Sequence, residues 1–274
     1  ITTTYGTGQL IKAVLDHGCR KMIIGIGGSA TNDGGAGMVQ ALGARLLDDE
    51  GKEIGYGGVQ LAKLNRIDIS RIDERIKKIK ILVASDVQNP LCGPIGASRI
   101  YGPQKGATEE MIATLDNALS HFADIIKRDL GKDIKDVPGT GAAGGLGAGL
   151  VAFLDAKLKS GIDIVINAVH LEEKLQNADL VISGEGEING STIYGKTLIG
   201  VAKAAKKYQI PVVSISALID VTGLIVKNYG IDFLIRPENP PMYMEYPKSR
   251  KIKLLTKTIS EFLKKNDKIL LTKY

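Results

Sequence analysis

Short apolar runs rich in β-branched residues alternate along this chain with longer stretches whose apolar residues recur at helical spacing. The runs are continuously apolar, which is typical of strands that helices cover on both faces. The predicted strands are Lys21–Gly27, Lys80–Asp86, Asp163–Asn167, Asp179–Gly184, Pro211–Ser216 and Asp232–Ile235. The predicted helices are Thr7–His17, Gly35–Ala44, Thr108–Asp129, Leu146–Leu158, Thr197–Tyr208 and Leu224–Tyr229, followed by a basic helix at Lys251–Lys265. This alternation predicts an α/β fold with mostly parallel strands.

Length and cysteine content indicate a globular protein with two domains and free thiols. The chain has 274 residues, of which 44% are hydrophobic, and this length favours two domains over one. Cys19 and Cys92 form no CxxC motif and are too few for a disulfide framework, so a cytoplasmic location is expected. The sequence shows no signal peptide and no apolar run of about eighteen residues, so no membrane segment is expected.

The net charge of +6 comes largely from lysines at Lys203–Lys207 and Lys248–Lys265. These stretches lack interleaved aromatic residues, which make up only 5% of the chain. Binding of nucleic acid is therefore not expected. A solvated basic surface that attracts anionic substrates is the preferred interpretation.

The segment GIGGSATNDGGAGM, residues 25–38, follows the first predicted strand directly. Ligands of open α/β sheets bind beyond the carboxyl ends of the strands, so the polar residues of this loop are candidate ligand contacts. Its first glycines also satisfy GxGxxG/A, with Asp48 at a suitable spacing for a dinucleotide fingerprint. However, Thr31 to Gly35 separate these glycines from the helix. Asp33 can therefore either cap that helix or act on a ligand.

Two further loops carry charged residues beside glycines. Asp86 ends an apolar strand, where a magnesium ligand or a base commonly lies, and a turn-capping role is the alternative. Lys105 in the sequence GPQKG could bind an anion or lie in solvent.

Gly190–Thr197 matches the P-loop pattern GxxxxGK[ST], but Glu185 and Glu187 lie between it and the strand. An anion contact by Lys196 at a helix N-terminus is preferred to a true P-loop.

The glycine-rich segment 139–147 reads GTGAAGGLG and follows a polar stretch rather than a strand. Its backbone amides could receive a phosphate, or its glycines could serve close helix packing. The three histidines lie outside all of these loops, so a histidine-based nucleophile or a zinc site is poorly supported.

Taken in order, the glycine-rich and polar loops resemble those of the bacterial glycerate kinases with a two-domain α/β fold. The matching segments are TTTYGTGQLI, GIGGSATNDGGAGMVQALGA, SDVQNPLCGPIGASRIYGPQKGA, GTGAAGGLGAGLVAFL and DLVISGEGEINGSTIYGKTLIGVAK. They are colinear over about Ile1–Leu218. The chain departs from the family at Asn189, where an acid is usual, and at Glu187, where a basic or polar residue is frequent.

The resemblance implies a flavodoxin-like parallel-sheet domain with a second α/β domain inserted in it. On this mapping, residues 1–165 form most of the inserted domain and residues 166–274 form the C-terminal part of the flavodoxin-like domain. The first strands of that domain belong to a preceding segment absent from this chain, and we expect the native protein to carry it. The implied activity is phosphorylation of D-glycerate, with ATP and Mg²⁺ as cofactors and with homodimer formation left open.

Our hypothesis for the site assigns each group by chemistry. The candidate substrate-binding residues are Ser29, Thr31, Asn32 and Lys105. The candidate catalytic acids are Asp33, Asp86 and Glu185, and Asp86 and Glu185 are also candidate magnesium ligands. The candidate phosphate-binding groups are Gly141, Gly144, Gly145 and Lys196. Which acid acts as the base stays open. Two alternatives remain: a non-catalytic family member that binds a nucleotide or a small hydroxy acid, and an NAD-dependent dehydrogenase.

Overall fold

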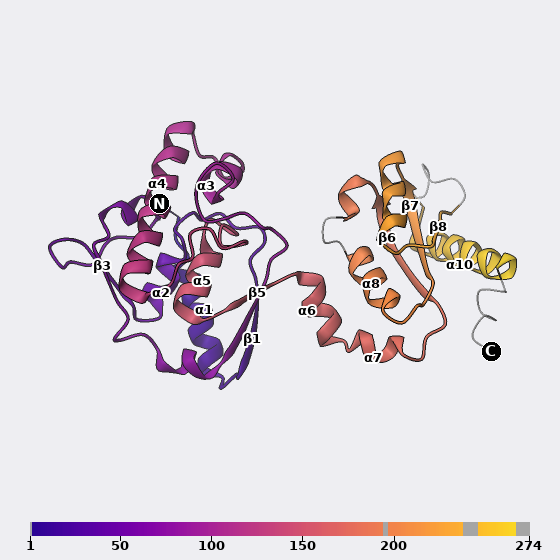
Figure 1. Cartoon of the computed structure of the whole chain (residues 1–274), viewed down its shortest axis with the longest axis horizontal. Coiled ribbons are helices and arrows are strands. Elements are labelled where there is room, and N and C mark those ends of the chain that lie inside the picture. The colour runs from indigo at the N-terminus through magenta and orange to yellow at the C-terminus, as the bar shows by residue number, and fades with distance from the viewer. Residues whose placement is uncertain (1, 194–196, 238–245, 267–274) are drawn as a thin grey trace. The chain divides into compact units, whose positions relative to one another are not determined.

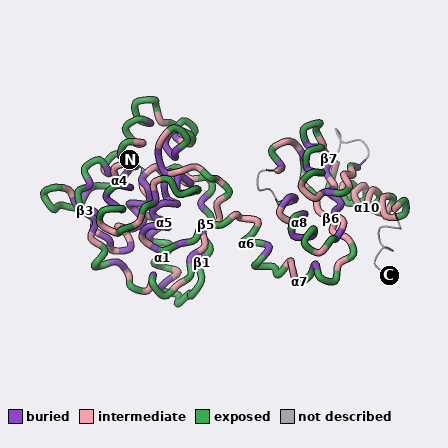
Figure 2. Tube along the Cα trace, viewed as in Figure 1, coloured by how far each residue is buried: buried purple, intermediate pink, exposed green. Residues whose placement is uncertain are grey.

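The computed structural model describes residues 2–193, 197–237 and 246–266. It divides the chain into two compact units, Ile1–Gly161 and Ile162–Tyr274 (Figure 1). Both units combine helices with parallel strands, which confirms the predicted α/β fold. Each unit has its own hydrophobic core (Figure 2).

The first unit is built around a three-stranded parallel sheet in the order β1-β4-β5, with β1 and β5 at its edges. These strands are β1 (Lys21–Gly25), β4 (Lys80–Ala84) and β5 (Lys157–Lys159). The register pairs Gly25 with Ala84 and Ala84 with Lys159, so all three strands end at the same edge. This carboxyl edge is where the polar loops predicted for ligand binding begin.

Helices and 3₁₀ turns enclose the larger core together with this sheet. They are α1 (Tyr5–Asp16), α2 (Ala36–Ala41), η1 (Gly58–Lys63), η2 (Glu74–Lys78), α3 (Ala97–Tyr101), η3 (Pro103–Lys105), α4 (Glu109–Leu130) and α5 (Leu146–Leu154). Helix α5 contacts the sheet at β4 and β5. Helix α4 begins after Thr108, whose hydroxyl accepts a hydrogen bond from the Met111 N–H, so the predicted cap is confirmed. Phe122 of α4 is fully buried and stacks on Phe153 of α5.

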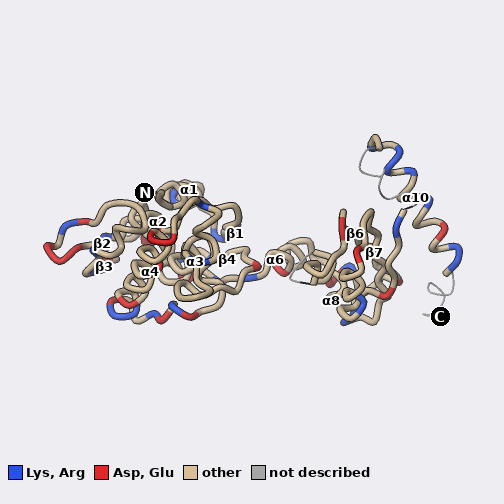
Figure 3. Tube along the Cα trace, turned by 90° about the horizontal axis from the view of Figure 1, so that it is seen from above, with Lys and Arg blue, Asp and Glu red and all other residues tan. Residues whose placement is uncertain are grey.

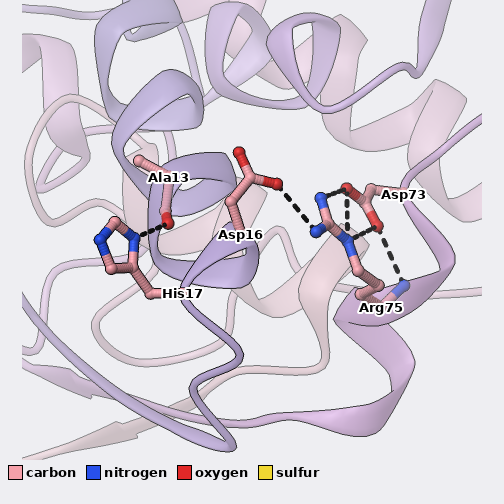
Figure 4. Close-up of polar contacts among 5 residues, drawn as sticks. All are labelled: Ala13, Asp16, His17, Asp73 and Arg75. Atoms are coloured by element: carbon pink, nitrogen blue, oxygen red, sulfur yellow. Dashed lines mark hydrogen bonds and ion pairs between the residues drawn. The ribbon is translucent and has the colours of Figure 1, made fainter.

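Outside the parallel sheet, the first unit has a small antiparallel pair that the sequence pattern did not indicate. It consists of β2 (Arg45–Leu47) and β3 (Arg66–Asp68). Figure 4 shows how η2 is joined to α1: Arg75 pairs with Asp73 beside it and with Asp16 at the end of α1. The hydrogen bond with Arg75 lowers the pKa of Asp73 below its usual range. The same helix end carries His17, whose Nδ1 donates to the Ala13 carbonyl.

The second unit contains the parallel sheet β6-β7-β8. Its strands are β6 (Val181–Ile188), β7 (Val212–Ile219) and β8 (Phe233–Ile235); its helices and turns are α6 (Gly161–Ala168), α7 (Leu171–Leu175), η4 (Gly190–Ile193), α8 (Thr197–Lys206), η5 (Val221–Tyr229) and α10 (Lys248–Lys265). Helix α8 packs on β6 and β7, and its Leu198 and Ala202 are fully buried. Helix α10 contacts β8 through an edge-to-face pair of Phe262 and Phe233.

Three predictions of secondary structure were wrong. Asp163–Asn167 is helical rather than extended, because a short apolar run has no period that separates a strand from a helix. Its neighbour Ile162 packs tightly over Gly200 of α8. The helix predicted to run to Leu158 ends at Leu154, and β5 follows it. Leu224–Tyr229 lies in the 3₁₀ segment η5 rather than in an α-helix.

Charged residues of both signs are spread over the first unit, whereas α10 is markedly basic (Figure 3). Its side chains include Lys248, Arg250, Lys251, Lys253, Lys257, Lys264 and Lys265. Among the residues that the structure describes, no helix is long and apolar enough to cross a membrane.

Candidate functional site

A pocket of about 320 Å³ lies at the carboxyl edge of the first sheet. Its walls come from the loops after β1 and β4, from α3 and η3, and from the segment before α5. The polar lining consists of Ser29, Ser85, Asp86, Tyr101, Gln104 and Lys105. Three of the residues predicted for the site, Ser29, Asp86 and Lys105, are therefore brought together here.

Asp86 is the pocket's only acid among the described residues. One of its carboxylate oxygens, Oδ1, accepts a hydrogen bond of 2.9 Å from the N–H of Gly161, the first residue of α6. The other oxygen has no hydrogen-bond partner within the described part of the chain. One oxygen therefore fixes the side chain, and the other remains available to a hydroxyl proton or a cation.

Lys105 is the pocket's cation and is partly buried. Its Nζ donates a hydrogen bond of 2.7 Å to the Thr31 carbonyl, which ties η3 to the first glycine-rich loop. Burial lowers the pKa of the ammonium, and the charge of Asp33 opposes that effect. Since an ammonium has three N–H groups, Lys105 can still donate to an anion in the pocket.

Tyr101 and Gln104 also line the pocket, and neither was among the predicted site residues. The Tyr101 hydroxyl bonds to Asn89 Oδ1 at 2.7 Å, and burial raises its pKa. Both residues lie within four positions of Lys105, Tyr101 at the end of α3 and Gln104 in η3. Their polar side chains beside a candidate ligand lysine were the signal that could have selected them.

Asp33 does not line this pocket. Its carboxylate is fully buried and accepts hydrogen bonds from the Thr4 N–H, the Thr4 hydroxyl, the Gly35 N–H and the Gly37 N–H. Thr4 in turn accepts a hydrogen bond from the Met38 N–H. Although α2 formally begins after Gly35, Asp33 satisfies the first N–H groups of that helix. This arrangement favours a positioning role over proton transfer.

Thr31 and Asn32 do not line the pocket either. Thr31 lines a neighbouring groove of about 480 Å³ between α1 and the edge of β1. Asn32 points to α3, where its Nδ2 donates to the hydroxyl of the fully buried Ser98. Its Oδ1 is buried without a hydrogen-bond partner. Of the predicted substrate-binding residues, only Ser29 and Lys105 therefore face the pocket.

The glycines predicted to bind phosphate are buried, and none of them lines the pocket. Gly141 donates its N–H to the Asn89 carbonyl, and Gly145 donates to the Gly141 carbonyl. At Gly144, φ is +67° and a Cβ atom would lie 2.0 Å from the Thr31 carbonyl oxygen. These glycines thus pack two loops against each other. The pocket wall of this segment is formed by Ala142 and Ala143.

The remaining predicted residues belong to the second unit. Glu185 lies on β6, and Lys196 lies outside the described residues. Asn189 accepts hydrogen bonds from the N–H and the hydroxyl of Ser191 through its Oδ1. It therefore stabilises the turn η4. Its Nδ2 also donates to Glu187 Oε1 at 3.3 Å, a hydrogen bond that a carboxylate at this position could not donate.

No group of three or more His, Cys, Asp or Glu side chains that could hold a metal occurs among the described residues. Magnesium in phosphoryl-transfer sites is commonly held by one or two carboxylates together with phosphate oxygens. The single open carboxylate oxygen of Asp86 fits such a partial ligand set.

Comparison with known proteins identifies the family to which a chain with this fold and pocket belongs. The glycerate kinase family model matches residues 1–265. The chain is 57% identical over 234 residues to a glycerate kinase of Bacillus subtilis and 60% identical over 233 residues to a glycerate 2-kinase of Escherichia coli K12. Each match covers 85% of this chain and 61% of the relative, so the chain spans about three fifths of the curated proteins that it matches.

A solved structure gives the same result. A protein from Salmonella typhimurium LT2 assigned as a glycerate kinase 2 aligns with a TM-score of 0.77 and 54% identity, over 86% of this chain and 61% of that chain. The fold is that of a family of α/β phosphotransferases. The chain belongs to the glycerate kinase family.

Proposed function

We propose that this protein phosphorylates D-glycerate with ATP and Mg²⁺. The observation that carries the proposal is the pocket at the sheet's carboxyl edge, in a chain of the glycerate kinase family, which combines the Lys105 ammonium with the Asp86 carboxylate. Its volume of about 320 Å³ lies at the small end of the range of ligand pockets. A cation for the substrate carboxylate and an acceptor for its hydroxyl are the two groups that glycerate requires.

In the proposed reaction, Lys105 binds the carboxylate and Ser29 contributes a further hydrogen bond. A substrate hydroxyl oxygen attacks the γ-phosphorus of ATP, the bond from that phosphorus to the β-phosphate oxygen breaks, and ADP leaves. The hydroxyl proton passes to Asp86. Such a reaction needs mainly positioning and neutralisation of charge. Asp33 contributes by fixing the loop that carries Ser29, because the two residues are four positions apart.

In this proposal, the backbone N–H of Ala143 is the group of the glycine-rich segment before α5 that contacts a phosphate. Ala143 has a left-handed backbone, with φ of 55°, and lines the pocket. Among the described residues its N–H has no hydrogen-bond acceptor. It also lies near the N-terminus of α5, where the helix dipole favours an anion.

Magnesium would neutralise charge on the transferred phosphates, and Asp86 is the residue of this pocket suited to hold it. Asp86→Asn distinguishes the two roles proposed for this acid. If Asp86 is the base, the variant loses turnover at every magnesium concentration. If Asp86 holds the metal, the magnesium concentration needed for half-maximal turnover rises.

The proposal is tested by measuring ADP formation with purified chain, ATP, Mg²⁺ and D-glycerate, with Lys105→Met and Asp86→Asn as comparisons. Calorimetry with ATP, NAD and D-glycerate accompanies the assay. Binding of ATP and glycerate without turnover would favour a non-catalytic member, and binding of NAD alone would favour a dehydrogenase. The exposed free thiol of Cys19 supports a reducing, cytoplasmic setting as part of the proposal.

A further inference from the structure

Tyr101 and Asn89 form a hydrogen-bonded pair at the wall of the pocket. Tyr101 lines the pocket, and its hydroxyl lies 2.7 Å from Asn89 Oδ1. Asn89 Nδ2 donates a hydrogen bond of 2.8 Å to the Ile95 carbonyl. The Asn89 backbone carbonyl accepts hydrogen bonds from the N–H groups of Gly139 and Gly141, which hold the residue in place.

The direction of each hydrogen bond in this chain follows from chemistry. The Ile95 carbonyl can only accept, so the amide nitrogen of Asn89 must face it. The amide oxygen of Asn89 then faces Tyr101, and this oxygen can also only accept. Tyr101 must therefore donate its single hydroxyl proton to Asn89. The Tyr101 oxygen retains acceptor capacity but has no proton left for a ligand.

We infer that Tyr101 is a specificity-determining residue, whose hydroxyl oxygen accepts a hydrogen bond from the glycerate hydroxyl that is not phosphorylated. The inference rests on the proposed function, because it assigns a third group of the same substrate. Lys105 binds the carboxylate, Asp86 serves the reacting hydroxyl, and Tyr101 recognises the remaining hydroxyl. The pocket therefore selects dihydroxy acids over acids with one hydroxyl.

The chemistry of Tyr101 fits this role. Burial raises its pKa, so it stays a neutral phenol and does not repel the substrate carboxylate. With its proton committed to Asn89, it cannot stabilise a carboxylate or phosphate oxygen. A substrate that lacks the hydroxyl would leave the Tyr101 lone pair without a partner, which is how binding sites reject such analogues.

The test measures the affinity of the purified chain for D-glycerate, D-lactate and 3-hydroxypropanoate by calorimetry. D-Lactate lacks the hydroxyl on carbon 3, and 3-hydroxypropanoate lacks the hydroxyl on carbon 2. We expect Tyr101→Phe to weaken glycerate binding about tenfold, the effect of one hydrogen bond. The analogue that lacks the hydroxyl recognised by Tyr101 should bind to the variant and to the unmodified chain equally well. The hydroxyl missing from that analogue is therefore the one that Tyr101 recognises.

Tyr56→Phe is the matched control, because Tyr56 is an exposed tyrosine that does not line the pocket. It should bind all three acids as the unmodified chain does. Circular dichroism verifies that both variants are folded. If Tyr101→Phe keeps the full preference for glycerate, the inference about Tyr101 is overturned and the proposed function stands. If the unmodified chain binds none of the three acids, the proposed function fails, and the role of Tyr101 fails with it.

Discussion

Replacing Asp33 by asparagine tests whether this buried acid positions the loop or transfers a proton. In the structure its Oδ2 accepts from the N–H and hydroxyl of Thr4 and from the Gly37 N–H, and its Oδ1 accepts from the Gly35 N–H. An asparagine has only one acceptor oxygen. In its better orientation that oxygen keeps three of these bonds, and its NH₂ group faces the Gly35 N–H.

The expected loss of stability follows from those four bonds. The buried Gly35 N–H loses its acceptor, which costs about 1–3 kcal/mol. The three other bonds change from charge-assisted to neutral, which costs roughly a further 2 kcal/mol in total. We expect the free energy of unfolding of the first unit to fall by about 3–5 kcal/mol. A unit of this size should then melt roughly 10 °C lower.

The assay is urea unfolding followed by circular dichroism, combined with turnover measured well below the melting temperature. Asp124→Asn is the control, since Asp124 is an exposed acid of the same unit that pairs with Lys135 at 3.3 Å. Its effect should stay within about 0.5 kcal/mol. The positioning role is refuted if Asp33→Asn unfolds like the unmodified chain and yet loses turnover at least a hundredfold, because that pattern identifies a base.

Three further predictions concern the pocket and its supporting loops. Asp86→Asn should lower turnover by about two orders of magnitude or more without shifting the urea midpoint, and normal turnover at all magnesium concentrations would exclude both roles proposed for this acid. Lys105→Met should raise the KM for glycerate about a hundredfold. Because burial lowers the pKa of Lys105, the KM of the unmodified chain should rise with pH before the ordinary lysine value of 10.5 is reached; a KM that stays flat up to that pH would argue against Lys105 as the carboxylate ligand. Gly144→Ala should destabilise the first unit by about 3 kcal/mol or more, whereas Gly131→Ala should cost roughly 1 kcal/mol. The two glycines have φ of +67° and +69°, but only at Gly144 would a Cβ atom collide with the Thr31 carbonyl, so equal losses would show that packing there is loose.

Local sequence determined much of the fold. The continuous apolar runs at β1, β4, β6 and β7 predicted parallel strands, because their periodicity is a property of a few adjacent residues. The Thr108 cap likewise needs only the neighbouring residues. Asp163–Asn167 was wrongly predicted because its apolar residues suit a strand as well as a helix, and only packing on α8 decides between them.

For the candidate site, the sequence determined which loops leave the carboxyl edge of the sheet, and the order of their motifs was sufficient to indicate the family. Which side chains of those loops face the pocket was decided by tertiary structure alone. Asp33 and Lys105 are both polar residues of segments near the carboxyl edge of the sheet. Asp33 is enclosed by its contacts with Thr4, whereas Lys105 lies beside the pocket. Tyr101 acquires its character as an acceptor only through Asn89, twelve positions away. Hydrogen bonds between separate loops have no local sequence pattern, and for this reason the tertiary structure was needed to assign these roles.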